Sequence, residues 1–478
     1  MSAQNCKIKM SFLFSPTLNI EDTLMAKNVI FGTDGVRGRA NRTPMDSEMA
    51  LQLGRAAAHV LKNGDHRHRI VIGKDTRLSG YMLETALASG ITSAGTDVLL
   101  VGPLPTPGVA FIAKSMRADA GVVISGSHND YRDNGIKFFD HNGLKLSDET
   151  EGKIEAAILS GKMEESRVSA EKLGKAFRID DASGRYIQFL KNCFPREKSL
   201  EHVKIVVDCA NGAAYHVAPN VLGELGATIY TLSDKPDGTN INLNCGSLHP
   251  EKMAQKVKEV GAVCGIALDG DADRVIMCDE KGHVLDGDVI LALCALHWKQ
   301  QGLLKKETLV ATVMSNLALD HTMEKYGIRV IRTQVGDRYV LETMLKEGLN
   351  VGGEQSGHLI FLDQNTTGDG VLGAMQVLTI MLEQNKPLSE LRKILEPYPQ
   401  VLLNVNVREK KDFVQIPAIQ KMIDDAKTVI GNKGRVFVRY SGTENIARVM
   451  VEGEDATKIK SLADNIRNAI QNNLGVLQ

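Results

Sequence analysis

The chain has 478 residues, in which 57 Lys and Arg side chains balance 58 Asp and Glu side chains. That length exceeds what one hydrophobic core supports and predicts three or four domains. The balanced charge gives no electrostatic basis for binding nucleic acid or an anionic membrane, and no apolar run reaches the length of a membrane span. We therefore expect a soluble protein in which any preference for anions comes from local clusters.

The seven cysteines are odd in number, scattered and never spaced as C-x-x-C. This pattern indicates reduced thiols in the cytoplasm rather than a disulfide framework or a zinc site. The N-terminus has only a brief apolar patch, Met10 to Phe14, and lacks the longer core of a signal peptide. We expect residues 1–26 to form a flexible extension, and the sequence leaves open whether Met1 or Met25 is the natural start.

Three segments share one pattern, in which a β-branched run is followed by a polar turn, a helical stretch and a second apolar run. They begin at Arg69, Val203 and Thr308. Units of this kind build a mostly parallel sheet covered by helices. Generic α/β sequences can produce a similar repeat, so the pattern favours three related α/β domains without proving them.

The pattern changes after Leu395. Two prolines precede an alternating strand, and then come a helix near 416–429, strands at 435–439 and 447–452, and a helix from Asp455. This order predicts a smaller C-terminal α+β domain, hinged to the rest of the chain at residues 396–400.

The first candidate site is DAGVVISGSHNDYRDNGIKFF, residues 119–139. A short buried strand ends in a polar turn that holds Ser127 and His128, so the serine hydroxyl can project from a rigid scaffold into a cleft. The same residue types also make an ordinary turn, and without a G-x-S-x-G elbow the Ser–His pair does not indicate acyl transfer. Lys137, on the next strand, is either a proton carrier beside phosphates or a solvated surface charge.

The second candidate site follows an apolar strand and consists of Asp269, Asp271 and Asp273. In an extended chain these alternate carboxylates point the same way. They would repel one another without a hard cation, and oxygen ligands of this kind suit Mg²⁺ or Ca²⁺. The alternative is a plain acidic turn. An EF-hand is excluded because its sixth position holds Arg274 instead of glycine, and this arginine could hold a phosphate near the metal.

Three further loops offer polar groups. In VGGEQSGH, residues 351–358, Glu354 and Ser356 could hold vicinal sugar hydroxyls, although glycine-rich polar loops are common. In FGTDGVRG, residues 31–38, Arg37 could reach a phosphate. In RYSGTENIAR, residues 439–448, hydroxyls and backbone N–H groups lie between two arginines, which suits either a phosphate that stays uncleaved or a tight hairpin with surface arginines. A nucleophile, a metal, a sugar clamp and a phosphate clamp together fit phosphoryl transfer on a sugar phosphate.

Ten segments, in this order, resemble the α-D-phosphohexomutase superfamily, and most closely its phosphoglucosamine mutase branch. They are FGTDGVRG, GKDTRLSG, ISGSHND with DNGIKFF, DCANGAAY, NINLNCGSLHPE, DGDADR, MSNLAL, TQVGDRYV, GGEQSGH and RYSGTENIARVM. The pieces GEQSGH and MSNL favour glucosamine over glucose or mannose.

The resemblance implies four domains around a central cleft, three of them related α/β mixed-sheet units and the last a small, mobile α+β domain. The expected domains, which carry the phosphoserine, metal, sugar and phosphate loops in that order, are residues 27–180, 181–280, 281–396 and 397–478. The implied reaction interconverts glucosamine 6-phosphate and glucosamine 1-phosphate through a phosphoserine and a 1,6-bisphosphate that is intermediate and activator. Its product would supply UDP-N-acetylglucosamine for cell envelopes, and the enzyme would be a monomer or a homodimer.

The resemblance also implies a role for each candidate residue. Ser127 would carry the phosphate, and one of its oxygens would join the three aspartates around one Mg²⁺. Arg37, His128 and Lys137 would surround the transferring group, with Lys137 as the proton carrier. Substrate would be bound by Arg274, by Glu354 and Ser356 at the sugar, and by Arg439, Ser441, Gly442, Thr443 and Arg448 at the distant phosphate.

Two residues depart from the family pattern, because Asp130 and Asn445 occupy positions where the family usually has proline. Asp130 adds a negative charge near the phosphoserine, and Gly126, where alanine is commoner, adds flexibility. We expect slower phosphorylation or a modest change in loop stiffness, without loss of function. Open alternatives are a phosphomannomutase or phosphoglucomutase, a non-catalytic sugar-phosphate sensor and a metal-dependent phosphatase.

Overall fold

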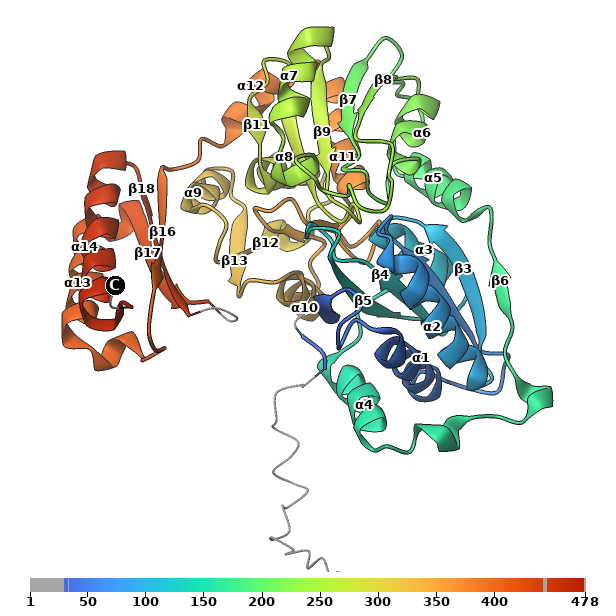
Figure 1. Cartoon of the computed structure of the whole chain (residues 1–478). Coiled ribbons are helices and arrows are strands. Elements are labelled where there is room, and N and C mark those ends of the chain that lie inside the picture. The colour runs from blue at the N-terminus through green and yellow to red at the C-terminus, as the bar shows by residue number, and fades with distance from the viewer. Residues whose placement is uncertain (1–29, 33, 442–444, 477–478) are drawn as a thin grey trace, which may run out of the picture.

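The structure is a computed structural model that describes residues 30–32, 34–441 and 445–476. The extension predicted for residues 1–26 lies outside the described residues. The described strands form four sheets, and Figure 1 shows the domains that contain them. Three domains combine a sheet with helices, and a small α+β domain ends the chain. This arrangement confirms the predicted fold class.

Domain I contains a six-stranded sheet in the order β1-β5-β4-β2-β3-β6. Its central strands β2, β3 and β4 are parallel, whereas β5 runs antiparallel to both β4 and β1. The elements are β1 (Val36–Arg39), α1 (Ser47–Val60), β2 (Arg69–Lys74), α2 (Ser79–Ser93), β3 (Asp97–Pro103), α3 (Thr106–Ser115), β4 (Ala120–Ile124), β5 (Asp133–Asp140), α4 (Asp148–Leu159) and β6 (Ala176–Arg178).

Domain II contains a five-stranded sheet in the order β11-β10-β9-β7-β8, and domain III a four-stranded sheet in the order β13-β12-β14-β15. The elements of domain II are α5 (Ala182–Asn192), β7 (Lys204–Asp208), α6 (Val217–Glu224), β8 (Thr228–Leu232), α7 (Glu251–Val260), β9 (Cys264–Leu268), β10 (Val275–Asp279) and β11 (Val284–Leu285). Those of domain III are α8 (Gly287–Gln300), β12 (Thr308–Thr312), α9 (Leu317–Lys325), β13 (Arg329–Thr333), α10 (Asp337–Glu347), β14 (Val351–Gly353), β15 (Leu359–Phe361), α11 (Gly370–Gln384) and α12 (Leu388–Leu391).

The three predicted strand–helix–strand repeats are present. Each repeat supplies a parallel pair, namely β2 with β3, β7 with β8, and β12 with β13. Local signals set the helix ends: the side chain of Asp46 accepts the N–H of Met49 at the start of α1, and left-handed Gly261 and Gly348 end α7 and α10.

Domain IV contains β16 (Gln400–Asn406), α13 (Pro417–Ile430), β17 (Gly434–Tyr440), β18 (Ile446–Gly453) and α14 (Ala456–Leu474). Its three strands pair antiparallel in the order β16-β18-β17. The predicted strands and helices of this domain lie within one or two residues of these bounds. No helix in the part of the chain that the structure describes is long and apolar enough to cross a membrane.

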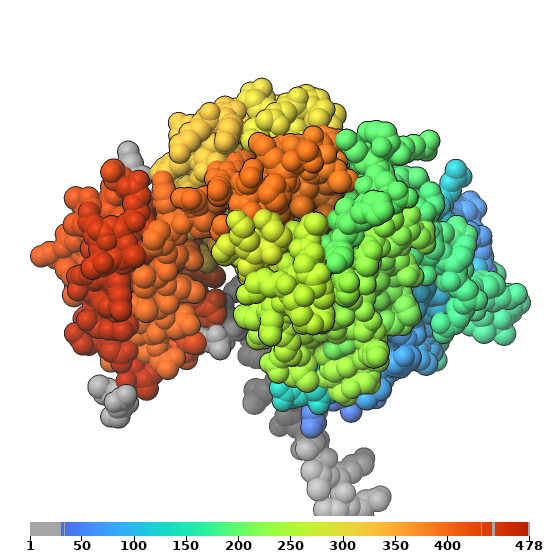
Figure 2. Space-filling view, turned by 90° about the horizontal axis from the view of Figure 1, so that it is seen from above, coloured from blue at the N-terminus to red at the C-terminus, as the bar shows by residue number. Residues whose placement is uncertain are grey.

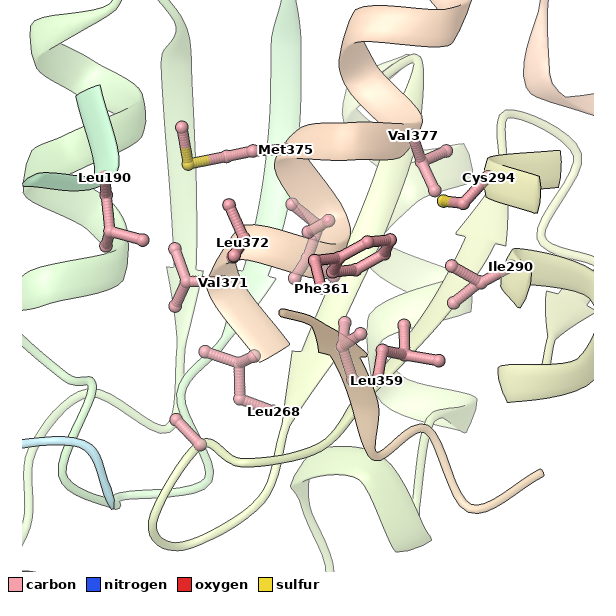
Figure 3. Packing of buried hydrophobic residues seen from close by; sticks show 14 of the residues in the cluster. Leu190, Leu268, Ile290, Cys294, Leu359, Phe361, Val371, Leu372, Met375 and Val377 are labelled. Carbon is pink, nitrogen blue, oxygen red and sulfur yellow. The ribbon is translucent and has the colours of Figure 1, made fainter. Parts of the chain in front are cut away.

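One hydrophobic core runs through the first three domains. It begins at α3 and α5, crosses the domain II sheet and reaches α8 and α11. Figure 3 shows its centre, where Phe361 and Leu359 of β15 pack beside Leu372 of α11. Domain IV instead has a core of its own, between its sheet and the helices α13 and α14. The first three domains therefore form a shared scaffold to which domain IV is joined as a separate unit.

A partly buried ion pair within domain IV contacts domain III. Arg435 donates to the carbonyl oxygens of Val313 (2.6 Å) and Ser315 (3.0 Å) and pairs with Glu452 (3.1 Å). The fully buried Glu452 carboxylate also accepts the N–H of Leu317, the first residue of α9, where the helix dipole favours a negative charge. Figure 2 shows domain IV (red) joined on one side, with an open space between it and domain II (yellow-green).

Candidate active site

The serine turn follows the carboxyl end of β4, a strand in the interior of the domain I sheet. The Ser127 side chain is almost fully buried, and its backbone has a left-handed φ of 50°. The Ser127 N–H donates to Ser125 Oγ (2.9 Å), whose hydroxyl donates to Asp75 Oδ2 (2.7 Å). The predicted strand-end serine is therefore held in a fixed, unusual conformation.

A buried arginine holds this turn in place. Arg77 has no exposed surface and donates from Nε to Asp75 Oδ2 (2.7 Å). Asn242 of domain II donates to the Ser127 carbonyl (2.8 Å) from the other side. The remaining guanidinium hydrogens point to main-chain carbonyl oxygens of the serine loop, those of Ser127 (2.8 Å), Asn129 (2.9 Å), Asp130 and Asp133 (3.1 Å). Arg77 lies in the GKDTRLSG segment, whose residue types alone do not indicate this role.

Replacing Arg77 with lysine should lower kcat about 10- to 100-fold, because misplacing a reacting group by about 1 Å can cost that much. Lysine cannot bridge four carbonyls, and each buried acceptor left unpaired costs about 1–3 kcal/mol. Steady-state kinetics check this, with Arg132→Lys as the matched control, because Arg132 lies in the same loop but forms an exposed pair with Asp130. Equal effects of the two changes would contradict a positioning role for Arg77.

The three predicted carboxylates do converge, but not by the geometry expected. The chain turns after β9 instead of staying extended: the Ala272 N–H donates to the Asp269 carbonyl (3.0 Å), and Ala272 has a φ of 55°. The carboxylates of Asp269, Asp271 and Asp273 are buried and lie with ligand oxygens within 4.8 Å of one another. A turn brings them together because small residues at 270 and 272 let the backbone fold sharply.

The triad meets the serine across the boundary of domains I and II. Ser127 Oγ donates to Asp269 Oδ2 at 2.7 Å. Burial and the charges of the other two aspartates raise the pKa of Asp269 well above its usual value. Burial also acts to raise the pKa of Asp273, but the positive charge of Lys137 and the contact with His358 outweigh it and bring this pKa well below its usual value.

Lys137 of β5 enters the same cluster and is not a solvated surface charge. Its buried ammonium lies 3.2 Å from Asp271 Oδ2, 3.4 Å from Asp273 Oδ2 and 3.3 Å from Asp34 Oδ2. Burial acts to lower the pKa of Lys137, but these three carboxylates raise it above its usual value. The ammonium therefore offsets part of the negative charge of these carboxylates.

Charged residues that were not among the predicted site residues extend this cluster into domain III. Lys145 pairs with both Asp34 and Asp337, and the ring of His358 lies 3.7 Å from Asp337 and from Asp273. Alternating charges thus connect three domains around the candidate site. Asp34, Asp337 and His358 lie inside segments that had been noted, but no single segment shows that they meet.

His128 and Arg274 lie beside the serine. His128 Nδ1 is 3.5 Å from Ser127 Oγ and accepts a hydrogen bond from Arg274 Nη1 (3.0 Å). Burial, together with the charges of Arg274 and Arg37, lowers the pKa of His128 to about 4, so its imidazole is neutral at neutral pH. Arg37 lies on β1 and forms an ion pair with Asp34.

The predicted sugar loop joins β14 to β15. Glu354 is half-buried, and its Oε1 accepts the N–H of Gly336 (3.1 Å). Ser356 is exposed, and its hydroxyl lies 3.5 Å from Glu354 Oε2. Because Arg274 forms a β-bridge with His358, this loop borders the triad.

The predicted phosphate clamp lies on the domain IV sheet, which stands apart from the domain I sheet (Figure 1). Arg439 of β17 is directly opposite Arg448 of β18, and burial and the Arg448 charge lower the pKa of Arg439. Like charges in register are unfavourable unless an anion lies between them. Ser441 is buried at the end of β17, whereas Gly442 and Thr443 lie outside the described residues.

The residues at the two positions that depart from the family pattern make local contacts. Asp130 forms an exposed ion pair with Arg132 (2.6 Å), and the hydrogen bond from Arg132 lowers the pKa of Asp130. The Asn445 carbonyl accepts the Val407 N–H (2.9 Å). Arg132 therefore partly offsets the added charge near Ser127, and the expected change in phosphorylation rate stays a prediction.

Models of four domains of one family match the chain in order: α/β/α domains I, II and III match residues 28–165, 184–282 and 286–398, and the C-terminal domain matches residues 402–469. The chain belongs to the phosphoglucomutase/phosphomannomutase family. This membership confirms the resemblance stated from the sequence, and it makes the chain an enzyme of the mutase type.

Curated relatives in this family cover nearly the whole chain. The phosphoglucosamine mutase of Citrifermentans bemidjiense is 61% identical over 446 residues, which is 93% of this chain and 98% of the relative. The phosphoglucosamine mutase of Myxococcus xanthus is 58% identical over 451 residues, 94% of this chain and 98% of the relative.

Solved structures share the fold. A phosphoglucomutase/phosphomannomutase family protein from Burkholderia thailandensis has a TM-score of 0.77 at 26% identity, covering 95% of this chain and 100% of that protein. The N-acetylphosphoglucosamine mutase of Aspergillus fumigatus, solved with GlcNAc-6P and magnesium, has a TM-score of 0.64 at 18% identity over 95% of this chain and 98% of that protein. At that identity, the second match supports the fold alone.

Proposed function

We propose that the protein is a phosphoglucosamine mutase, which interconverts glucosamine 6-phosphate and glucosamine 1-phosphate through a phosphorylated Ser127. The observation that carries the proposal is the 2.7 Å contact between Ser127 Oγ and Asp269, one of three buried carboxylates that together could hold a cation. The 61% identity to a phosphoglucosamine mutase supports glucosamine as the sugar.

The triad fits one Mg²⁺. Oδ1 of Asp271 and Oδ1 of Asp273 are buried and have no hydrogen-bond partner among the described residues, so they are available as ligands. Buried oxygen-only ligands suit a hard cation. The ion would be held by Asp269, Asp271 and Asp273 with an oxygen of phospho-Ser127, and when bound it would neutralise charge on the transferring phosphoryl group.

The residues around Ser127 would align and stabilise that group, which is the main task in phosphoryl transfer. In the first step, the bond from phosphorus to Ser127 Oγ breaks and a bond to the 1-oxygen of glucosamine 6-phosphate forms, which yields the 1,6-bisphosphate. Ser127 Oγ gains a proton and the sugar hydroxyl loses one, and Lys137, whose ammonium touches the triad, is the proposed carrier. Arg37 and Arg274 supply positive charge, and the neutral His128 lies beside the serine oxygen.

The second step is the reverse transfer from the other end of the sugar. The bisphosphate turns and presents its 6-phosphate to Ser127, so that the bond to the 6-oxygen breaks and phospho-Ser127 is restored. Glu354 and Ser356 hold the sugar hydroxyls, and the domain IV clamp binds whichever phosphate is distant. The separate core of domain IV supports a movement of this domain during the exchange.

Turnover of glucosamine, glucose and mannose 6-phosphates, followed by phosphorus NMR, tests the proposal. We expect kcat/KM to be highest for glucosamine 6-phosphate. A higher value for glucose or mannose 6-phosphate would instead favour a phosphoglucomutase or a phosphomannomutase, whose chemistry this site would serve equally.

Arg439→Gln should raise KM for the sugar phosphate about 10- to 100-fold, because a charge-assisted hydrogen bond to phosphate contributes about 1.5–3 kcal/mol. The melting temperature of the free protein should not fall, because the substitution removes the unfavourable pairing with Arg448. Kinetics and calorimetry measure both, with Arg467→Gln on α14, in an exposed pair with Asp464, as the control. An unchanged KM would place the distant phosphate elsewhere.

We also propose the cellular compartment and the oligomeric state of the protein. The described cysteines 193, 209, 245, 264, 278 and 294 are free thiols, which supports the cytoplasm as the compartment. We propose a monomer or a homodimer that uses glucosamine 1,6-bisphosphate as activator and supplies UDP-N-acetylglucosamine synthesis. Analytical ultracentrifugation determines the assembly, and intact mass after incubation with the bisphosphate shows whether Ser127 becomes phosphorylated.

A further inference from the structure

Two histidines and an aspartate meet at the end of the domain I sheet where its parallel strands begin. The serine turn lies at the opposite end of these strands. His66 and His68 precede β2, and Asp119 precedes β4, its parallel neighbour. The Asp119 N–H donates to the Arg69 carbonyl (2.9 Å), which fixes the two segments side by side. The three side chains thus lie at the amino ends of the strands, whereas Ser127 follows the carboxyl end of β4.

The three donor atoms lie close enough together to hold one metal ion. His66 Nε2 and His68 Nδ1 lie 3.0 Å and 3.1 Å from the same oxygen, Asp119 Oδ1, and all three atoms lie within 4.8 Å of one another. Around a tetrahedral Zn²⁺ with bonds of about 2.0–2.1 Å, neighbouring ligand atoms are about 3.3 Å apart. Two of the three separations therefore need to change by only a few tenths of an ångström.

The second oxygen of the aspartate is already fixed. Asp119 Oδ2 accepts the N–H of Arg69 (2.8 Å), a contact that orients the carboxylate and leaves Oδ1 directed at the two rings. Arg67, a nearby positive charge, pairs with Asp97 (2.6 Å). Lys62 Nζ donates to the Ala94 carbonyl (2.7 Å) and lies close enough to Asp119 for that carboxylate to act on the pKa of Lys62.

We propose that His66, His68 and Asp119 form a second metal site, which binds a divalent transition ion such as Zn²⁺ or Ni²⁺. Imidazole nitrogens favour these ions, whereas Mg²⁺ and Ca²⁺ prefer oxygen ligands. The His66 side chain is 54% exposed and that of Asp119 only 6%, so the ion reaches the site from solvent and water completes its coordination. The cysteine pattern could not indicate this site, because it contains no thiolate.

The ion would join the amino ends of β2 and β4. Because it binds the folded domain I and not separated strands, it would stabilise this domain in proportion to the logarithm of its concentration above Kd. This effect is independent of the catalytic triad and of the proposed sugar-phosphate chemistry. Binding should weaken on acidification, because imidazole binds metal only in its neutral form.

Calorimetric titration of the full chain with Zn²⁺, in saturating Mg²⁺, tests the proposal. We expect the parent to bind one equivalent of Zn²⁺. The double variant His66→Ala/His68→Ala should lose this equivalent or bind it at least tenfold more weakly, whereas Asp269→Asn should retain it. His141→Ala removes an exposed histidine elsewhere in domain I and is the matched control. Zn²⁺ should also raise the melting temperature of the parent and of Asp269→Asn, but not that of the double variant.

Each contrary result is informative. If the double variant binds the equivalent as tightly as the parent, the two histidines are not the ligands. If Asp269→Asn loses the equivalent, the ion belongs to the catalytic triad. The single variant His66→Ala changes only an exposed side chain outside the hydrophobic core, so a weaker affinity in this variant cannot be attributed to unfolding.

Discussion

Ser127→Ala is expected to lower turnover of glucosamine 6-phosphate at least about 10⁴-fold, because the proposed mechanism passes the phosphate through the Ser127 hydroxyl in both transfers. Binding of the sugar phosphate should persist, since Arg274, Glu354 and the domain IV clamp are unchanged. The intact mass of the variant should stay that of the unphosphorylated chain after incubation with the bisphosphate. Initial rates, equilibrium binding and mass spectrometry together measure these outcomes.

Ser125→Ala is the matched control. Ser125 is equally buried, but its hydroxyl only accepts the Ser127 N–H and donates to Asp75. Its loss leaves one buried N–H unpaired, at about 1–3 kcal/mol, so kcat should fall partially while phosphorylation of Ser127 persists. Undiminished turnover by Ser127→Ala would reject the phosphoserine mechanism. If Ser127→Ala released inorganic phosphate at the same rate as the parent, the protein would be a phosphatase. A parent that binds sugar phosphate without turnover or phosphorylation would be a sensor.

Asp269→Asn and Asp273→Asn should each lower kcat about 10²–10³-fold, because a metal contributes several kcal/mol of charge stabilisation in the transition state. Their effects on the Mg²⁺-free protein should have opposite signs. Asp269 is a buried carboxylate beside two others, and Lys137 contacts those two but forms no ion pair with Asp269, so neutralising Asp269 relieves repulsion and raises the melting temperature. Asp273→Asn removes a partner of Lys137 and of His358 and should lower stability by about 1–3 kcal/mol.

Differential scanning calorimetry with chelator, and again with Mg²⁺, separates these effects. The parent should gain stability on adding Mg²⁺, and both variants should lose most of that gain. If both variants melt below the parent in chelator by the same amount, the charge distribution described for the triad is wrong. If both keep the Mg²⁺-dependent gain, the ion binds elsewhere.

The sequence was sufficient for residues whose chemistry is visible within one segment. Ser127 at a strand end, three spaced aspartates and a lysine on the next strand are each readable from residue types and periodicity. The fold class was readable for the same reason, because each strand–helix–strand repeat is a local pattern. The path of the backbone was not predicted correctly, because the aspartates converge through a turn and not along an extended strand. The small residues Gly270 and Ala272 were the available signal for that turn.

Residues that act across domain boundaries could not be predicted in this way. Lys145 and Asp337 are ordinary charged residues in their own segments, and they pair with each other across 192 positions of sequence. Their roles arise only when domains I, II and III pack through the shared core. The same holds for Asn242, whose amide reaches the serine loop from domain II.

The left-handed backbone at Ser127 also explains why this position should not accept threonine, although both side chains offer a hydroxyl that can be phosphorylated. A β-branched residue is strongly disfavoured at a φ of 50°, and the extra methyl group would have to fit beside Asp269 in a buried turn. A phosphothreonine form of the enzyme would therefore place its oxygen poorly, even with every other group intact. The shape of the main chain, rather than hydroxyl reactivity, would then select serine as the proposed carrier of the phosphate.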